Sequence, residues 1–465
     1  MTDLAPEAAE KSAEKDEWDT PLTPDFVNRV MKALDRGDAT IVCELVAPLR
    51  PADQAELLEL VRPDELRLLV QMLGNDLDPE VLSELEEAVR DDVIELMAPK
   101  DIAAAIQEMD SDDAVYVLED MDEDEQREVL DQMEPHEREV IERTLEYPED
   151  SAGRIMQREL VAVPPFWDVG QTIDFMRDAG DLPDDFYEIF VVDPSYQPVG
   201  TVPLSRLLRT KRPVTIADIM DDEQTLISVS MDREDVARLF EKYDLISAAV
   251  VDENDRLVGV VTVDDIVEII AEEASEDIRR LGGIVSEESV SDTVMETTRN
   301  RFSWLFVNLL TAILASLVIA IFDGTIEQMV ALAVLMPIVA SMGGNAGTQT
   351  MTVAVRALAT RDLVPLNTGR IVTREVMVGL LNGIVFAVLM GTAGGLWFQD
   401  FLLGGVLAAA MIINMVLAGL AGILVPLALD RFGADPAIAS SVFVTTVTDV
   451  VGFFAFLGLA GLVLF

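Results

Sequence analysis

The sequence has almost none of two residue types that build catalytic and metal centres. Among its 465 residues there is one cysteine, Cys43, and one histidine, His136. A single cysteine excludes an intrachain disulfide, and the two residues together cannot form a Cys/His metal cluster. His136 lies in EPHEREV, where a helix is expected to start, and this favours a surface position. No nucleophile–base pair or phosphate loop is recognisable, so we do not expect an enzyme.

Basic residues are also scarce, because 33 Lys and Arg stand against 85 Asp and Glu and give a net charge of −52. Nearly all of this charge falls in residues 1–300, since residues 301–465 hold only six basic and eight acidic side chains. Such a region argues against nucleic acid or an anionic membrane surface as its partner and favours cations. The pI of about 4.1 is also typical of a halophile. On that interpretation most carboxylates form a solvated surface.

The N-terminal part carries a helical pattern. Residues 1–21 are polar and predict a disordered tail, with no basic and apolar run that would mark a cleaved signal peptide. Residues 22–151 contain segments of about a dozen residues, such as RPDELRLLVQML, with apolar positions at i, i+3, i+4 and i+7. Helices that short bury little surface alone, so we expect an all-α domain of stacked hairpins.

A duplicated unit follows. Its first copy, residues 152–217, contains VVDPSYQPVG, and its second copy, residues 218–271, contains VVDENDRLVG. Each segment predicts a strand, a turn and a second strand, followed by an amphipathic helix, so two small α/β domains are expected in tandem. Residues 272–300 predict a charged helical connector with a Gly-Gly break.

Residues 301–465 are predicted to lie in a lipid bilayer. Five apolar stretches, 302–322, 326–353, 371–398, 402–429 and 437–465, each exceed the roughly 20 residues that a spanning helix needs. The positive-inside rule places the N-terminus in the cytosol and the C-terminus outside the cell, in a multi-pass protein of the plasma membrane. The arginines that flank one set of span ends are Arg299, Arg301, Arg356, Arg361, Arg370, Arg374 and Arg431.

One carboxylate stands inside these stretches. Asp449, in VTTVTDVVGFF, is the only acidic residue well inside a span, and no lysine or arginine lies at that depth to pair with it. A membrane carboxylate is costly unless it is hydrated, paired or bound to a cation, so Asp449 is predicted to serve a hard divalent cation. A protonated aspartic acid that hydrogen-bonds between helices is the alternative.

The second stretch contains Pro337 and then SMGGNAGTQT, residues 341–350. Proline and glycine are predicted to break or thin this helix, which a membrane tolerates only against protein or water. Asn345 would then line a passage. Close packing of small residues between helices is the alternative explanation of the glycines.

These segments together resemble the MgtE family of magnesium channels from residue 22 onward. The resemblance is carried by YPEDSAGRIM, both repeated units, EEASEDIRRL, SMGGNAGTQT with VRALATRDL, and TTVTDVVGF. It implies an N-terminal helical superhelix (22–151), two CBS domains (152–217 and 218–271), a plug helix that closes the pore (272–300) and a five-helix transmembrane pore domain (301–465). It also implies a homodimer with the pore between subunits.

The resemblance also implies site residues. Asp449 matches the family's pore aspartate, which holds Mg2+ mainly through its water shell, and Asn345 matches the asparagine of the GGN turn. Ser441 departs from the family's asparagine, which leaves the coordination around Asp449 open. The implied function is Mg2+ uptake through a channel that cytosolic Mg2+ closes. Carboxylates at the implied cytosolic Mg2+ sites are Asp232, Glu234, Asp265, Glu268, Glu273, Glu276 and Asp277.

Several alternatives stay open. Mn2+, Co2+ and Ni2+ bind equivalent oxygen sites at least as well as Mg2+, so their transport is not excluded. A secondary transporter would need a coupling ion, and the apparent absence of a second membrane carboxylate disfavours it. A membrane-anchored sensor would need neither Asp449 nor a broken span. The sequence from Gly259 through Thr262 to Asp265 fits a nucleotide-ribose pattern, yet Pro203 and Arg206 replace its polar residues in the first copy, which favours a helix cap over an adenine-nucleotide site.

Overall fold

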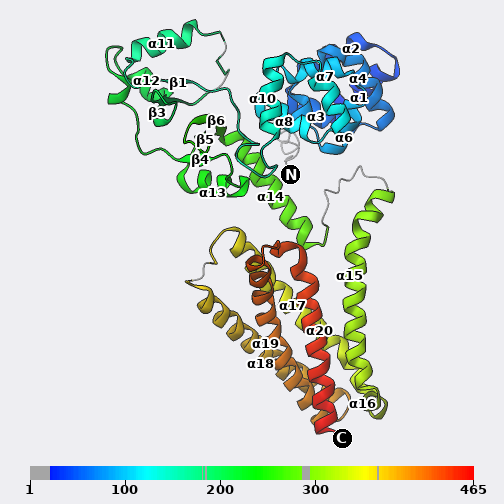
Figure 1. Cartoon of the computed structure of the whole chain (residues 1–465). Helices are drawn as coiled ribbons and strands as arrows, with labels where there is room; N and C mark the ends of the chain where they lie inside the picture. Colours follow the sequence, from blue (N-terminus) through cyan, green and yellow to red (C-terminus); the bar gives the residue numbers. More distant parts are fainter. Residues whose placement is uncertain (1–20, 181, 184–185, 285–293, 364–365) are drawn as a thin grey trace, which may run out of the picture. The chain divides into compact units, whose positions relative to one another are not determined.

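The computed structural model describes residues 21–180, 182–183, 186–284, 294–363 and 366–465 (Figure 1). They divide into two compact units, Met1–Ala271 and Glu272–Phe465. The fold is multidomain and mostly helical, as expected. The predicted tail, apart from residue 21, and part of the predicted connector lie outside the described residues.

Short helices open the first unit. Five of them begin at a proline, whose fixed φ suits the first helical position and whose missing N–H is not needed there. The elements are α1 (Pro24–Asp35), α2 (Ala39–Val46), α3 (Pro51–Leu60), α4 (Pro63–Leu73), η1 (Gly74–Asp76), α5 (Val81–Glu84), α6 (Glu87–Ile94), α7 (Pro99–Ile106), α8 (Ser111–Glu119), α9 (Glu123–Leu130) and α10 (Pro135–Leu145).

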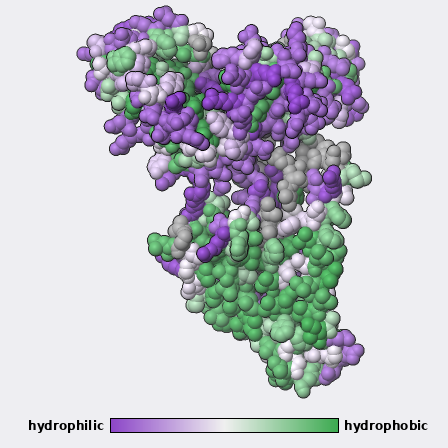
Figure 2. Space-filling model, viewed as in Figure 1, coloured by the Kyte–Doolittle hydropathy of each residue, from purple (hydrophilic) through white to green (hydrophobic). Residues whose placement is uncertain are grey.

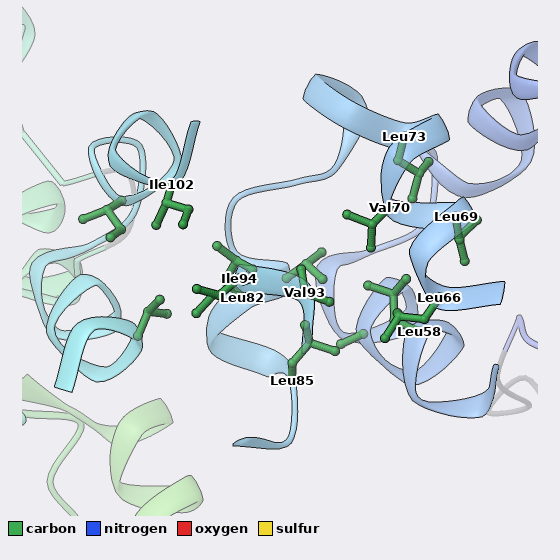
Figure 3. Close-up of a cluster of buried hydrophobic side chains, with 14 of the residues drawn as sticks. Leu58, Leu66, Leu69, Val70, Leu73, Leu82, Leu85, Val93, Ile94 and Ile102 are labelled. Carbon is green, nitrogen blue, oxygen red and sulfur yellow. The ribbon is translucent and has the colours of Figure 1, made fainter. Parts of the chain in front are cut away.

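These helices share one hydrophobic core (Figure 3). Leu58 of α3, Leu69 of α4 and Leu82 of α5 are almost fully buried in it. Each helix is too short to be stable alone, so the apolar face that it buries against its neighbours supplies most of its stability. The apolar periodicity of the sequence predicted this stacking.

The duplicated unit folds into two three-stranded sheets of the same topology. In each sheet the first strand pairs parallel with the second, and the second pairs antiparallel with the third. The register shifts after Val191 in one sheet and after Val250 in the other, which are equivalent positions of the repeat. The elements are β1 (Ala162–Val163), α11 (Val169–Asp178), β2 (Glu188–Val192), β3 (Pro198–Pro203), α12 (Leu204–Arg209), η2 (Ile216–Asp218), β4 (Leu226–Ser228), α13 (Arg233–Tyr243), β5 (Ser247–Val251) and β6 (Leu257–Thr262).

Among the described residues of the second unit, five helices are long and apolar enough to cross a membrane. Figure 2 shows their surface as mainly hydrophobic, whereas the surface of the first unit is mainly hydrophilic. Helix α19 packs against α17, α18 and α20. The helices are α14 (Val263–Leu281), which begins in the first unit, α15 (Val294–Ile321), α16 (Asp323–Gln328), α17 (Ala331–Ala359), α18 (Thr368–Trp397), α19 (Phe401–Arg431) and α20 (Pro436–Val463).

The predicted break in the second span is wrong. Helix α17 runs without interruption through Pro337 and through the whole of SMGGNAGTQT. Its glycines bring neighbouring helices close instead: a Cβ on Gly347 would lie 2.5 Å from Val444 Cγ1 of α20. Small residues at this spacing let membrane helices approach, which outweighs the low helix propensity of glycine.

Candidate ion pathway and acidic sites

Asp449 lies on α20 and is half-buried. Among the described residues it has neither a hydrogen-bond partner nor an ion-pair partner. The neighbouring threonine hydroxyls donate within their own helix, from Thr445 to Ser441 O at 2.9 Å and from Thr446 to Val442 O at 2.6 Å. The lone pairs of these hydroxyls remain able to accept. This turn of α20 thus offers oxygen acceptors and an unpaired carboxylate, which suits a hydrated cation.

The segment of α17 that contains Asn345 packs beside this turn. A Cβ on Gly344 would lie 3.9 Å from Thr445 Cγ2, and one on Gly347 would lie 3.5 Å from Thr448 Cγ2. The structure therefore brings the two helices that carry Asn345 and Asp449 together. Asn345 itself is exposed on the single chain, so it is open to solvent or to a second chain.

Two polar residues of this region were missed by the sequence analysis. Asn414 of α19 is 1% exposed, and its Nδ2 donates to the Val339 carbonyl of α17 at 2.8 Å. Glu375 of α18 is 8% exposed and accepts from Thr350 Oγ1 of α17 at 3.3 Å. Asn414 could have been found as a lone amide in an apolar run. Glu375 follows Arg374, so in the sequence it looks like part of the charged flank of a span. Glu375 lies near the start of α18, so it is a second buried carboxylate in a candidate span, although Asp449 is still the one well inside a predicted stretch.

The end of α14 contacts α17 and α20 within the second unit. Leu281 packs against an apolar cluster that is formed by Met351 and Val355 of α17 and by Ala437 and Val444 of α20. Arg280 forms ion pairs with Glu276 on its own helix and with Asp435, which caps α20. Burial, followed by the nearby carboxylates of Asp435 and Glu273, raises the pKa of Asp277. Three predicted regulatory residues, Glu273, Glu276 and Asp277, thus share the last turns of α14.

A second acidic group lies within the first unit, between the start of α14 and α8. Burial and the Asp265 carboxylate raise the pKa of Asp113 to about 7 and raise that of Asp112 well above its usual range. Glu268 also raises the pKa of Asp113. Burial raises the pKa of Asp265 to about 6. The predicted residues Asp265 and Glu268 therefore face Asp112 and Asp113, which the sequence analysis did not single out because acidic residues are ordinary in the first turn of a helix.

The remaining predicted residues have local contacts. Asp232 caps α13, where its side chain accepts from the Glu234 N–H at 2.9 Å. Thr262 Oγ1 donates to Asp265 Oδ2 at 2.7 Å, and Asp265 also accepts from the Thr262 backbone, as a helix cap does. Within the described ranges no three carboxylate, His or Cys side chains are arranged to hold a metal ion. The acidic side chains of these groups thus lie close together but do not form a complete metal-binding site.

Comparisons with known proteins match each part of the chain. Family models match residues 49–150 as the MgtE intracellular N domain, residues 152–212 and 216–272 as CBS domains, and residues 336–459 as the divalent cation transporter domain MgtE. A Magnesium transporter MgtE from Enterococcus faecalis is 33% identical over 322 residues, which are 69% of this chain and 71% of that protein. The chain belongs to the MgtE family. Both the resemblance stated from the sequence and the expected fold class are confirmed.

A second curated relative agrees with this assignment, and one solved structure is reported beside it. A Magnesium transporter MgtE from Thermus thermophilus is 35% identical over 333 residues, covering 70% of this chain and 73% of that protein. A solved structure described as the cytosolic domain of the Mg2+ channel MgtE in complex with ATP is 28% identical and covers 52% of this chain and 99% of that one, with a TM-score of 0.49.

Proposed function

We propose that this protein is a Mg2+ channel whose ion pathway runs along α17 and α20. The observation that carries the proposal is the unpaired Asp449 carboxylate on α20, beside the α17 segment that contains Asn345. A carboxylate with neutral oxygens around it can hold a cation through its water shell, and Mg2+ loses that shell reluctantly. The names of the relatives support Mg2+ as the ion. Mn2+, Co2+ and Ni2+ are expected to compete.

The pathway is proposed to lie between two copies of the chain. Asn345 is exposed on the single chain, whereas Gly343 and Gly347 of the same helix are buried. A polar side chain facing lipid would be costly, whereas at a two-fold axis it would line water together with its copy. The arginines at one set of span ends support an orientation with the N-terminus in the cytosol and the C-terminus outside, in the plasma membrane.

The acidic groups are proposed to sense cytosolic Mg2+. Burial raises the pKa values of Asp112, Asp113 and Asp265, and the Asp265 carboxylate adds to the shift of the other two, as expected for like charges held close together. The group formed by Asp277, Glu273 and Asp435 has the same character at the pore helices. A divalent cation that bridges such carboxylates would relieve the repulsion and draw their helices together. Cytosolic Mg2+ would therefore favour the closed state, with α14 held against α17 and α20.

A carrier is the second candidate, because Glu375 supplies a second buried membrane carboxylate. Its contact with Thr350 of α17 would allow protonation there to move α17. The two candidates differ in ion flow, since a channel passes many ions in each opening and a carrier moves a few in each cycle.

Single-channel recording of the purified protein in a planar bilayer separates these functions. We expect Mg2+ unitary currents that Asp449→Asn abolishes while the protein still assembles, because the ion then lacks a compensating charge at low dielectric. Glu375→Gln should leave unitary currents in place. Mg2+ flux without unitary currents, lost in Glu375→Gln, would establish the carrier instead.

A further inference from the structure

We infer that Asn414 is a positioning residue for ion permeation, and that its amide sets the spacing between the helices carrying Asn345 and Asp449. This inference rests on the proposed permeation along α17 and α20. Asn414 is on α19, so it belongs to neither helix, and it is 1% exposed.

The amide contacts both pore-lining helices. A Cβ on Gly343 of α17 would lie 2.1 Å from Asn414 Nδ2, and one on Gly452 of α20 would lie 2.8 Å from the same atom. Gly343 precedes Asn345 by two residues, and Gly452 follows Asp449 by three. Both glycines leave space that the amide fills, so any larger residue at either position would push the helices apart.

A hydrogen bond fixes the amide in this space. Nδ2 donates to the Val339 carbonyl at 2.8 Å. In an α-helix this carbonyl also faces the amide of residue 343, four positions later, and its two lone pairs accommodate both donors. The bond therefore ties α19 to the turn of α17 that leads into Gly343 and Asn345.

Stability alone does not account for an asparagine here. Its Oδ1 is buried and has no hydrogen-bond partner among the residues that the structure describes. A buried acceptor without a partner costs free energy, whereas leucine has nearly the same shape and carries no polar group. An amide kept at such a cost is expected to serve function, and a fixed distance between the two pore helices is what its contacts provide.

The test uses Mg2+ flux into liposomes that contain equal amounts of the full chain, which detects a channel or a carrier. Asn414→Leu should raise the half-saturating Mg2+ concentration at least threefold and lower the preference for Mg2+ over Ca2+. A helix-packing role would lower only the maximal flux, through loss of folded protein. The matched control is Asn382→Leu, since Asn382 is exposed on α18.

A double variant separates hydrogen bonding from packing. Gly343→Ala should fail to assemble, because its new methyl group overlaps the amide. The combination of Gly343→Ala with Asn414→Ala removes the overlap and should assemble, yet its half-saturating concentration should stay raised because the bond to Val339 is absent. A wild-type half-saturating concentration in this double variant or in Asn414→Leu would overturn the inference. Absence of Mg2+ flux through the wild type would overturn the proposed function itself.

Discussion

Arg280, at the end of α14, forms an ion pair with Asp435, the residue that caps the N-terminus of α20. Asp435 accepts from the Ala437 N–H at 2.7 Å with its other oxygen. One carboxylate thus shapes the start of the helix that carries Asp449 and also holds the end of α14. Because Leu281 also packs against the apolar cluster that includes Val444, both an ion pair and apolar packing hold the end of α14.

Arg280→Gln should make the channel harder to close. Removing the cation leaves Glu276, Asp277 and Asp435 to repel one another, which disfavours the docked position of α14. A partly buried pair of this kind contributes about 1 kcal/mol, so the closing Mg2+ concentration should rise roughly threefold to tenfold. The measurement is open probability against cytosolic Mg2+. Asp435→Asn keeps the helix cap and serves as the partner variant; an unchanged closing concentration in both would remove this contact from gating.

Replacement of Asn345 should depend on size. Asn345→Leu places an apolar branched side chain in the proposed water-lined passage and should lower unitary conductance more than tenfold. Asn345→Ala leaves the passage open and should lower it less than tenfold, since only one hydrogen-bonding group is lost. Asn382→Leu is the control for inserting leucine into an exposed membrane position. Near-normal conductance in both Asn345 variants would favour a packing role for this segment.

The sequence predicted the elements well because they depend on local patterns. Apolar periodicity identified the short helices, and the repeated VVD and VG segments identified two sheets whose registers shift at equivalent valines. The continuity of α17 was missed for a tertiary reason. The glycines look helix-breaking in the sequence, but the side chains of Asn414, Val444 and Thr448 on neighbouring helices pack against them. Only the three-dimensional packing reveals this.

The candidate site was predicted in part. Asp449 was identifiable because a charged residue is conspicuous in an apolar stretch. Asp112 and Asp113 were not, because their significance arises from Asp265, some 150 positions later in the chain. Arg154 of the YPEDSAGRIM segment shows the same limitation. It donates to the Tyr147 carbonyl at 2.7 Å and pairs with Glu119 of α8 at 3.1 Å, a role that the motif alone does not state.

The burial of Glu119 predicts a pH dependence of stability. Burial raises the pKa of Glu119 to about 7, although Arg154 opposes the shift. The folded state therefore binds this proton more tightly than the unfolded state, so the stabilisation is complete below about pH 4 and is lost as pH rises through 7. Thermal unfolding should show that the free energy of unfolding falls between pH 5 and pH 8 in the wild type. In Glu119→Gln this fall should be smaller by about 1–3 kcal/mol. Glu146→Gln, at an exposed position, should follow the wild type; equal losses in all three proteins would contradict the assignment.

The acidic group at α8 and α14 yields the last prediction. Mg2+ bridging Asp112, Asp113 and Asp265 should hold the two helices together and protect the first unit from proteolysis, with protection rising at millimolar Mg2+.

The salt concentration decides whether long-range repulsion or direct coordination of Mg2+ is tested. At 1 M salt the Debye length is only about 3 Å, so long-range repulsion is screened and direct coordination must act. Limited proteolysis of the full chain in molar KCl is therefore the measurement. The pair Asp112→Asn with Asp113→Asn should abolish the Mg2+ effect, and Glu276→Gln with Asp277→Asn should weaken it. If protection does not respond to Mg2+ at constant ionic strength, these carboxylates are an adaptation to salt and not a sensor, because screened charges without a bound ion cannot couple the two helices.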